Sequence, residues 1–229
     1  MARMKTNSTK TEIVRVATRM FLEKGFTNTS VKMISDELGI STGNLTFHFP
    51  SKWHLLSVAV EMLCDFRLQM MKQALQKGQT PLAAICIELA ALASVCEEDE
   101  IARDFYIQAY THPLPLTILR RRGAVRAKAV FGQYCRDWTD EHFAEAQTLV
   151  SGMEFGTLMV TEDSADLQVR IAGALSCIMT LYGVPAQIRR AHIQRATKTD
   201  YRATAQRMFC EFTEHMERMD DKVMESYLK

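Results

Sequence analysis

The stretch from Ile34 to Lys52 constrains the fold of this chain more than any other part of the sequence. It predicts the end of one helix, a tight turn at Gly39, a very short helix over residues 42–48, and the start of a further helix. Ser41 stands where an N-cap residue belongs, and Pro50 prevents the short helix from continuing. A helix of about two turns has marginal stability in isolation. Its presence in the chain makes sense if its outer face is used to bind a partner.

The short helix has few side chains with which to bury itself. Leu45 and Phe49 lie four residues apart on one helical face, and we expect them to point inward. The residues left on the outer surface are Thr42, Asn44, Thr46 and Phe47. Gly43 lowers the stability of the helix by about 1 kcal/mol relative to Ala. Its presence is explained either by something large that approaches the backbone or by crowding in the turn. The groove of duplex DNA is the partner that suits such a helix best.

Composition and apolar periodicity predict an all-α protein. Hydrophobic residues make up 47% of the 229 residues, enough for a packed core, and there are only 10 Gly and 5 Pro. Apolar positions recur with the 3.6-residue period of a helix, and alternating strand patterns are few. Residues 1–9 are expected to form a polar, basic arm. The predicted helices span about 10–24, 31–38, 42–48, 52–77, 81–96, 101–110, 120–134, 139–160, 164–183, 185–195 and 200–227, with a break at 111–116.

Two domains are predicted, one over residues 1–54 and one over residues 55–229. They are joined by the long helix that begins at Lys52, whose ~25 residues extend about 38 Å. Residues 1–54 carry eight Lys and Arg against four Asp and Glu, whereas the remainder carries 20 against 23. A basic module joined to a mildly acidic one suits nucleic-acid binding by the first domain.

The N-terminal domain resembles the DNA-binding domain of the tetracycline-repressor (TetR) family. The matching runs are A-x-x-M-F-L-E-K-G-F at 17–26, T-S-V-K-M-I at 29–34, L-G-I-S-T-G-N-L at 38–45, F-H-F-P-S-K at 47–52 and L-L at 55–56. The resemblance implies a homodimer whose two short helices enter the major groove of a palindromic operator. It also implies an all-helical C-terminal domain that dimerises and binds a small effector. The chain is therefore expected to be a transcriptional regulator, a repressor that the effector releases from its operator.

The resemblance also implies which residues meet DNA. The recognition face carried over from the family is Thr42, Gly43, Asn44, Thr46 and Phe47, with phosphate or base contacts at Lys32, His48 and Lys52 and in the arm at Arg3, Lys5 and Lys10. Asn44 can form a bidentate pair with adenine, and threonine methyl groups can touch the thymine methyl. Backbone amides at the helix start capped by Ser41 can bind phosphate. The family usually has Tyr where this chain has the shorter Thr46, so Phe47 is expected to take over part of that surface.

Two further sets of residues are predicted in the second domain. The dimer interface comprises Leu149, Gly152, Met153, Gly156, Val160, Ile171, Ala174, Leu175, Ile178 and Leu181, although packing within the chain also explains these residues. The effector pocket comprises Phe66, Met70, Glu88, Phe105, Tyr106, Tyr110, Phe131, Tyr134 and Trp138, each of which also suits an ordinary core position. Glu88 either receives a cationic effector or pairs with an arginine.

The sequence offers little support for other classes of protein. Its six histidines lack metal-ligand spacing, and neither G-x-S-x-G nor a glycine-rich phosphate loop is present, so neither catalysis nor a cofactor is expected. Six scattered cysteines without C-x-x-C are expected to be reduced core residues of a cytoplasmic protein, and no apolar run is long enough to span a membrane. Two alternatives stay open, a DNA-binding protein without an effector and a helical enzyme.

Overall fold

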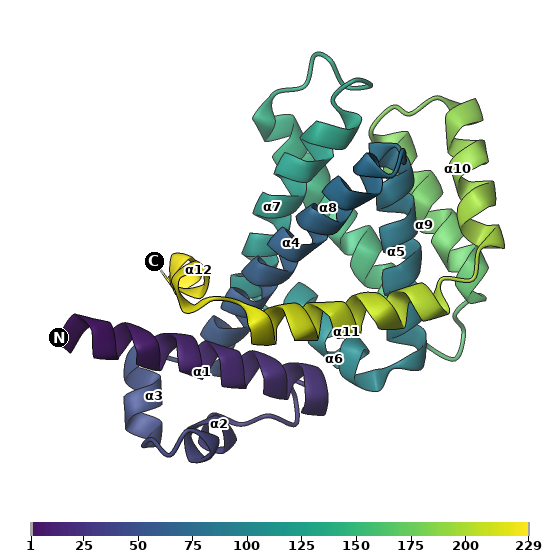
Figure 1. Cartoon of the computed structure of the whole chain (residues 1–229). Helices are drawn as coiled ribbons and strands as arrows, with labels where there is room; N and C mark the ends of the chain where they lie inside the picture. Colours follow the sequence, from purple (N-terminus) through teal and green to yellow (C-terminus); the bar gives the residue numbers. More distant parts are fainter. Residues whose placement is uncertain (1, 229) are drawn as a thin grey trace. The chain divides into compact units, whose positions relative to one another are not determined.

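The computed structural model describes the backbone of residues 2–228 and the side chains from Thr9 to Leu228. Within that range the chain forms α-helices and one short 3-10 helix, without strands, which confirms the predicted all-α class. None of the described helices is long and apolar enough to cross a membrane. In chain order the elements are α1 (Ala2–Lys24), α2 (Val31–Glu37), α3 (Thr42–His48), α4 (Lys52–Gln76), α5 (Pro81–Glu98), α6 (Glu100–Thr111), α7 (Pro113–Phe131), α8 (Asp140–Leu158), α9 (Leu167–Leu181), α10 (Ala186–Lys198), α11 (Arg202–Arg218), α12 (Asp221–Glu225) and η1 (Ser226–Leu228) (Figure 1).

The first helix is longer than predicted. α1 begins at Ala2 rather than near Lys10, so the backbone of residues 2–9 is helical and does not form an irregular arm. This stretch contains neither Gly nor Pro, and nothing in it interrupts a helix. The side chains of Arg3 and Lys5, predicted to contact DNA, lie outside the described residues.

Two other helix boundaries differ from prediction for identifiable reasons. The predicted break over 111–116 shrinks to His112, because prolines fit the first turn of a helix and Pro113 begins α7. The predicted helix over 200–227 is divided into α11, α12 and η1, because Asp220 caps a new helix with its carboxylate.

Packing divides the chain into two compact units. Unit 1 comprises Met1–Asp65, Glu100–Ile118 and Met208–Lys229, and unit 2 comprises Phe66–Asp99 and Leu119–Arg207. The first division falls inside α4. The expected functional boundary between residues 54 and 55 stays a prediction, since the units follow packing and unit 1 takes in α6 and the C-terminal helices.

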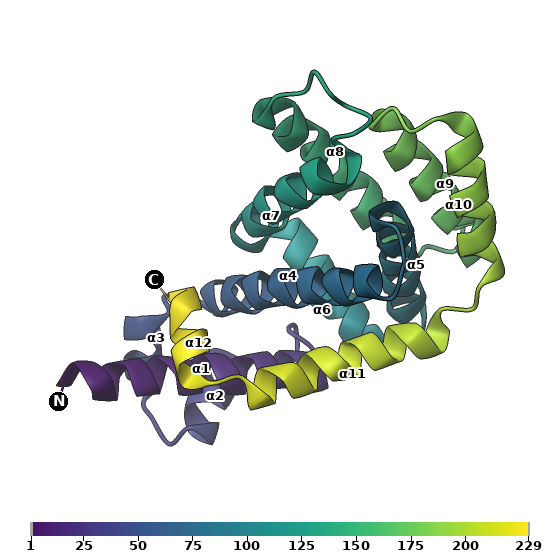
Figure 2. The same ribbon diagram turned by 45° about the horizontal axis from the view of Figure 1, so that its top comes forward.

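α1 is the centre of unit 1, where it packs against α2, α6 and α12. Four of its apolar side chains are fully buried: Ile13, Val14, Ala17 and Phe21. Arg15 donates hydrogen bonds to the carbonyl oxygens of Met216 and Met219, each at 2.8 Å. It also forms an ion pair with Asp221 at 2.9 Å. Arg15 therefore caps the end of α11 and fastens the C-terminal helices beside α1, as Figures 1 and 2 show.

α5 is the centre of unit 2 and is buried on nearly all sides. It packs against α8, α9 and α10, and α9 packs against α8 and α10 in turn. The sequence explains this position, because the run from Pro81 to Cys96 carries one charge, Glu88, among apolar and small residues. Beside this layer the rings of Phe131 and Tyr182 stack, with their centroids 4.2 Å apart.

Glu88 is the buried charge at the centre of unit 2. Each of its carboxylate oxygens accepts a hydrogen bond from Arg126 Nη1 at 2.7 Å, and the carboxylate also pairs with Arg67 on α4. Burial raises the pKa of Glu88, but the charges and hydrogen bonds of Arg126 and Arg67 outweigh it and hold the pKa below its ordinary value. Of the two roles expected for Glu88, the structure shows the pairing with arginine.

Replacing Glu88 with Gln is expected to destabilise the protein by about 3–5 kcal/mol at neutral pH, because two buried guanidinium groups lose their counter-charge. The folded-state pKa of Glu88 lies below the unfolded value, so its stabilisation is complete above the unfolded pKa. The stabilisation is lost as the pH falls through the folded value, and the effect of Glu88→Gln shrinks with it. Urea unfolding at pH 7 and at about pH 3 measures both effects.

The control for this variant is Glu145→Gln, which changes the same side chain on the exposed surface of α8. It is expected to stay within about 0.5 kcal/mol of the wild type. If Glu88→Gln unfolds at the same urea concentration as the wild type at pH 7, the stabilising role assigned to the ion pairs of Glu88 is contradicted.

Candidate nucleic-acid interface and candidate ligand cavity

The turn after α2 fixes the direction in which the chain enters α3. Gly39 adopts a left-handed backbone conformation with φ of 64°, which residues with a side chain rarely adopt. Its N–H donates to Asp36 O at 3.2 Å. The N–H of Ile40 donates to Ser35 O at 3.0 Å. Together these two bonds form a Schellman motif, so α2 ends at a defined residue and the following segment leaves it at a fixed angle.

α3 is held by its cap, by one buried side chain and by a contact with α2. Ser41 Oγ accepts a hydrogen bond from Asn44 N at 3.2 Å, which satisfies a free amide of the first turn. Leu45 is the one buried residue of the helix and is fully enclosed. The buried Ser35 hydroxyl lies 3.2 Å from the hydroxyl of Thr42 and links α2 to α3.

The remaining surface of α3 is open to solvent. The predicted recognition residues that are exposed are Ser41, Thr42, Gly43, Asn44, Thr46 and Phe47. Phe47 has 82% of its surface exposed, which is unusual for an aromatic side chain that no partner covers. The side-chain amide of Asn44 makes no hydrogen bond with the described residues, so its donor and its acceptor are both available.

Gly43 and Thr46 show what the outer face of α3 can accommodate. A Cβ placed on Gly43 would meet only Ser41 Oγ, at 4.0 Å. Crowding within the chain therefore does not require a glycine here, which leaves the close approach of a partner as the explanation. The Thr46 hydroxyl donates to the carbonyl oxygens of Thr42 at 3.0 Å and Gly43 at 3.2 Å. Because these bonds occupy its proton, Thr46 offers a partner its methyl group rather than a donor.

Lys32 and His48 lie on the same helix-turn-helix element. Lys32, on α2, is exposed and has no ion pair among the described residues. His48 ends α3 and is half-buried, with its ring 5.2 Å from the Phe47 ring in an edge-on arrangement. Both positions keep a cationic or protonatable group on the element that carries the exposed α3 surface.

Lys52 is occupied within the chain. Its ammonium group donates to Phe26 O at 2.9 Å and to Thr29 O at 3.1 Å. It also lies 4.2 Å from the centre of the Phe26 ring. Burial lowers the pKa of Lys52, and the Asp104 carboxylate opposes that shift. The structure therefore gives Lys52 a role in fixing the start of α4, in addition to the phosphate contact predicted for it.

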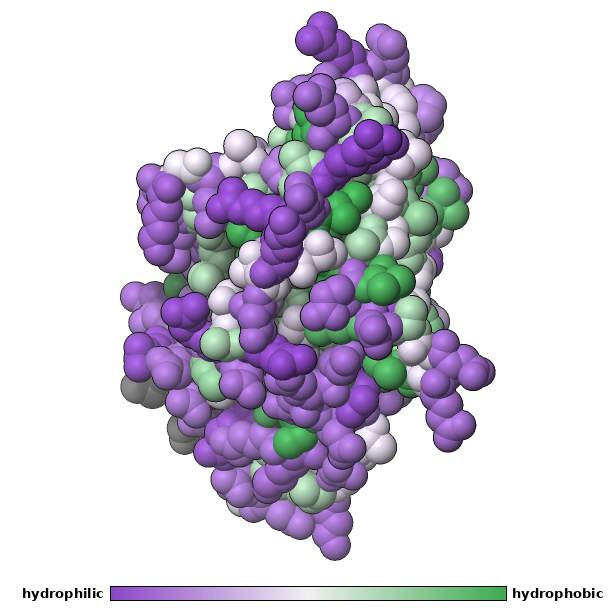
Figure 3. All heavy atoms as spheres, turned by 90° about the vertical axis from the view of Figure 1, so that its right-hand side faces the viewer, coloured by the Kyte–Doolittle hydropathy of each residue, from purple (hydrophilic) through white to green (hydrophobic). Residues whose placement is uncertain are grey.

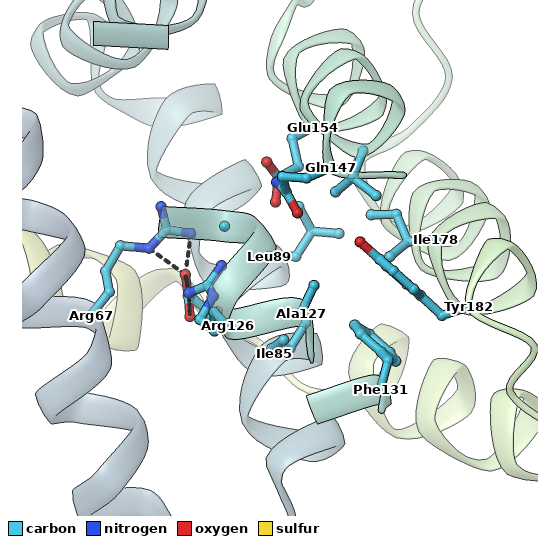
Figure 4. A pocket seen from close by; sticks show the side chains of 13 residues that line it. Arg67, Ile85, Leu89, Arg126, Ala127, Phe131, Gln147, Glu154, Ile178 and Tyr182 are labelled. Atoms are coloured by element: carbon cyan, nitrogen blue, oxygen red, sulfur yellow. Dashed lines mark hydrogen bonds and ion pairs between the residues drawn. The ribbon is translucent and has the colours of Figure 1, made fainter. Parts of the chain in front are cut away.

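Unit 2 contains a cavity beside the ion-paired cluster of Glu88, Arg67 and Arg126, with a volume of about 30 Å³. Side chains from α4, α5, α7, α8 and α9 line it, and Figure 4 shows Tyr182 and Ile178 opposite the two arginines. Its lining residues are Arg67, Ile85, Glu88, Leu89, Gly123, Arg126, Ala127, Phe131, Gln147, Val150, Glu154, Ile178 and Tyr182.

Few of the predicted pocket residues line this cavity. Glu88 and Phe131 do, and Trp138 lies nearby with its ring 5.7 Å from that of Tyr182. The predicted residues that do not line it are Phe66, Met70 and Tyr134, together with Phe105, Tyr106 and Tyr110, which are buried in unit 1. The aromatic side chains of α6 are therefore core residues of a different unit.

The sequence pattern does not single out Gln147 and Tyr182, which prove to be polar cavity residues. One signal for Gln147 exists. It falls four residues after Phe143 and three before Val150, on the face of α8 that is otherwise apolar and buried. A polar residue on such a face marks either an internal hydrogen bond or a polar cavity. Tyr182 follows the apolar helix α9 and carries no comparable signal.

The exposed face of α8 fits the predicted dimer interface. On α8, Leu149 is 50% exposed and Met153 is half-buried, and Val160, two residues after the end of the helix, is 40% exposed. Gly152 and Gly156 are exposed, and a Cβ on either would meet no atom within 4 Å. Their small size is therefore not needed for packing within the chain, and it leaves room for an approaching helix.

The α9 part of the predicted interface requires correction. The predicted residues Ile171, Ala174, Leu175 and Ile178 are buried inside unit 2, and Leu181 is half-buried. The exposed stripe of α9 consists of Val169, Gly173, Cys177 and Thr180. Cys177 on this stripe and Cys210 on α11 are exposed rather than in the core.

On the face shown in Figure 3, which includes α10, hydrophilic side chains dominate and apolar ones form only small patches.

Comparison with known proteins places the helix-turn-helix element in a family. The family model for "Bacterial regulatory proteins, tetR family" matches residues 13–59. The uncharacterized HTH-type transcriptional regulator YerO of Bacillus subtilis is 38% identical over 66 residues, which are 29% of this chain and 23% of YerO. The HTH-type transcriptional repressor KstR2 of Mycolicibacterium smegmatis is 31% identical over 75 residues, 33% of this chain and 37% of KstR2. The helix-turn-helix element of this chain is therefore similar to that of tetR-family regulators.

The matched stretches cover less than two fifths of either curated relative, so the sequence likeness is that of the N-terminal part. A likeness in structure extends further along the chain. The crystal structure of RolR without ligand is similar to it with a TM-score of 0.59 and 23% identity, covering 80% of this chain and 95% of RolR. At that identity the likeness concerns the fold, which confirms an N-terminal helix-turn-helix followed by an all-helical body.

Replacing Lys52 with Met is expected to lower the stability of the protein by about 1–3 kcal/mol, because two carbonyl oxygens lose a charged donor. Thermal unfolding measures the change, with Lys24→Met, an exposed lysine at the end of α1, as the control. The control is expected to keep the wild-type melting temperature. An unchanged melting temperature in Lys52→Met would show that the ammonium group has no structural role.

Proposed function

We propose that this chain is a transcriptional regulator that binds duplex DNA through the exposed face of α3. The observation that carries the proposal is the helix itself, which has seven residues, one buried side chain and an outer surface that includes Asn44 and Phe47. The major groove of B-DNA admits a single α-helix, and a helix held in this way can be inserted without unfolding. The family model covers this element, and both curated relatives are named as HTH-type transcriptional proteins.

The side chains of α3 supply the chemistry for reading base edges. Asn44 has a free amide that can bond adenine at N6 and N7. Thr46 offers a methyl group, and Phe47 offers an exposed ring, to the thymine methyl. Gly43 lets the helix backbone come close to the DNA. Lys32 and the Ser41 end of α3 contact phosphates, which position the helix without reading sequence.

The protein acts as a homodimer, with one α3 in each half of a palindromic operator. Two such helices must lie about 34 Å apart, one turn of the DNA, to reach successive major grooves on one side of the duplex. The dimer forms through the exposed faces of α8 and α9, which carry Leu149, Val169 and three glycines with open space around them, together with Val160 just after α8. A two-fold axis through this surface would pair each helix with its own copy.

The second unit controls the spacing of the two α3 helices. α4 begins at Lys52, which is tied to the loop before α2, and continues from unit 1 into unit 2. A ligand that prefers a different position of α4 therefore shifts the dimer away from the conformation that fits the operator. Since KstR2 is named a repressor, we expect this chain to repress and the ligand to relieve repression.

Replacing Asn44 with Ala is expected to weaken operator binding about 5- to 150-fold, because one bidentate base contact discriminates by about 1–3 kcal/mol. Fluorescence anisotropy measures the affinity on a duplex that the wild-type chain enriches from a random library. The matched control is Gln187→Ala, which removes an exposed amide side chain from α10 and should bind like the wild type. Equal affinity in Asn44→Ala, Gln187→Ala and wild type would reject α3 as the reading helix.

Replacing both Gly152 and Gly156 with Leu is expected to convert the dimer into a folded monomer. A Cβ at either position meets no atom of its own chain within 4 Å, and the leucine side chains would occupy the space into which the partner helix would pack. Sedimentation velocity measures the mass, and circular dichroism confirms the helix content. Ala191→Leu, which enlarges an exposed residue of α10, is the control and should remain dimeric. A double variant that is still dimeric and folded places the interface elsewhere.

A further inference from the structure

The hydroxyl of Tyr182 has no hydrogen-bond partner among the described residues, although Tyr182 is only 1% exposed. Buried polar groups almost always have a partner, so an unpaired hydroxyl in a core needs an explanation. Figure 4 shows this hydroxyl pointing away from Phe131 and into the space beside Gln147 and Leu89. The group is therefore aimed into the cavity rather than toward a neighbour that it fails to reach.

The ring of Tyr182 cannot easily turn to find another partner. It stacks on Phe131 with the ring planes 7° apart, and Trp138 and Phe143 pack around it with centroids at 5.7 Å and 6.2 Å. Its backbone carbonyl accepts a hydrogen bond from Cys135. Burial raises the pKa of Tyr182, with smaller contributions from Glu154 and Cys135, so the hydroxyl keeps its proton. The packing thus holds a hydrogen-bond donor at a fixed position on the cavity wall.

Gln147 provides a second polar group on the opposite wall. It is 6% exposed, and its side-chain amide makes no hydrogen bond with the described residues. It lies over Gly123, where a Cβ would come within 2.5 Å of Gln147 Nε2. The glycine on α7 is therefore what allows the amide to occupy this place. Since no hydrogen bond fixes the amide, a change of rotamer that enlarges the cavity would break packing contacts but no hydrogen bond.

The charges around the cavity balance one another. They belong to two arginines, Arg67 and Arg126, and two glutamates, Glu88 and Glu154. Arg126 Nη1 donates hydrogen bonds to both oxygens of Glu88, while Nε and Nη2 of Arg126 make no hydrogen bond with the described residues. A ligand with a net charge would upset this balance in a buried site, whereas an uncharged acceptor would not. The rest of the lining is apolar, including Ile85, Leu89 and Val150.

We propose that the cavity binds a small uncharged organic molecule that has a carbonyl oxygen and an apolar body. The carbonyl oxygen accepts hydrogen bonds from the Tyr182 hydroxyl and the Gln147 amide, and the apolar body lies against Leu89, Val150 and Ile178. The volume of about 30 Å³ has room for one or two water molecules, so the Gln147 side chain must change rotamer to admit the ligand, and in the new rotamer its amide donates to the carbonyl oxygen. The site's role as the effector site rests on the proposed function, whereas ligand binding itself does not.

Four probes that share a six-membered ring test the chemical class: cyclohexanone, cyclohexanol, cyclohexanecarboxylate and cyclohexylammonium. Isothermal titration and thermal shift are expected to show the tightest binding and the largest stabilisation with cyclohexanone. Tyr182→Phe is expected to weaken cyclohexanone binding at least tenfold. Tyr134→Phe, which alters a tyrosine outside the cavity, is the control and should bind like the wild type.

The same variants show whether the Tyr182 hydroxyl is unpaired in the free protein or bonded to an internal water molecule. If Tyr182→Phe is as stable as the wild type without probe, the hydroxyl is unpaired in the free protein, as proposed. If Tyr182→Phe is less stable than the wild type but binds every probe with the wild-type affinity, the hydroxyl bonds only an internal water molecule and the proposal fails. Tighter binding of the carboxylate or the ammonium probe, or no binding of any probe, also overturns it.

Operator binding measured in the same samples separates this proposal from the proposed function. Cyclohexanone binding that leaves operator affinity unchanged supports the ligand site and rejects its role as the effector site. Operator binding without any response to the probes supports DNA recognition and rejects the ligand site.

Discussion

The burial of Leu45 is the contact on which the proposed function depends. α3 is too short to be stable alone, and this one side chain joins it to the core of unit 1. Ser41 caps its start and Phe49 is buried just after its end, so both ends are fixed with little use of the helix surface. The exposed residues between these ends are left for a partner. The exposure of Phe47 and the unneeded glycine at position 43 are two consequences of the same arrangement.

The start of α4 is fixed to the same element by Lys52, whose ammonium group binds the carbonyl oxygens of Phe26 and Thr29. Asp104 on α6 adds a second attachment to that loop, accepting hydrogen bonds from Thr27 N at 2.7 Å and Thr27 Oγ1 at 2.6 Å. A displacement of α4 or α6 would therefore move the loop before α2 with it. Farther along α4, Arg67 pairs with Glu88 beside the cavity, which puts a charged contact of the same helix at the proposed ligand site.

The sequence predicts the helix-turn-helix well because its determinants are local. A glycine at the turn, a serine cap and two apolar residues four apart specify the position and the inner face of α3 without knowledge of the rest of the fold. The cavity is different, because Gln147 and Tyr182 are brought together only by the packing of α8 and α9. α9 has apolar residues on more than one side, so its inner face is settled by tertiary contacts and not by its own pattern. The role of Lys52 is likewise hidden, since backbone carbonyls are acceptors that no sequence motif marks.

In the proposed complex, two copies of α3 read inverted half-sites on duplex DNA. Selection of bound duplexes from a random library by the wild-type chain, followed by sequencing, tests it most directly. We expect enrichment of one inverted repeat whose half-sites lie about 10 base pairs apart, centre to centre. Failure to enrich any sequence, or enrichment of a single unrepeated site, would contradict it.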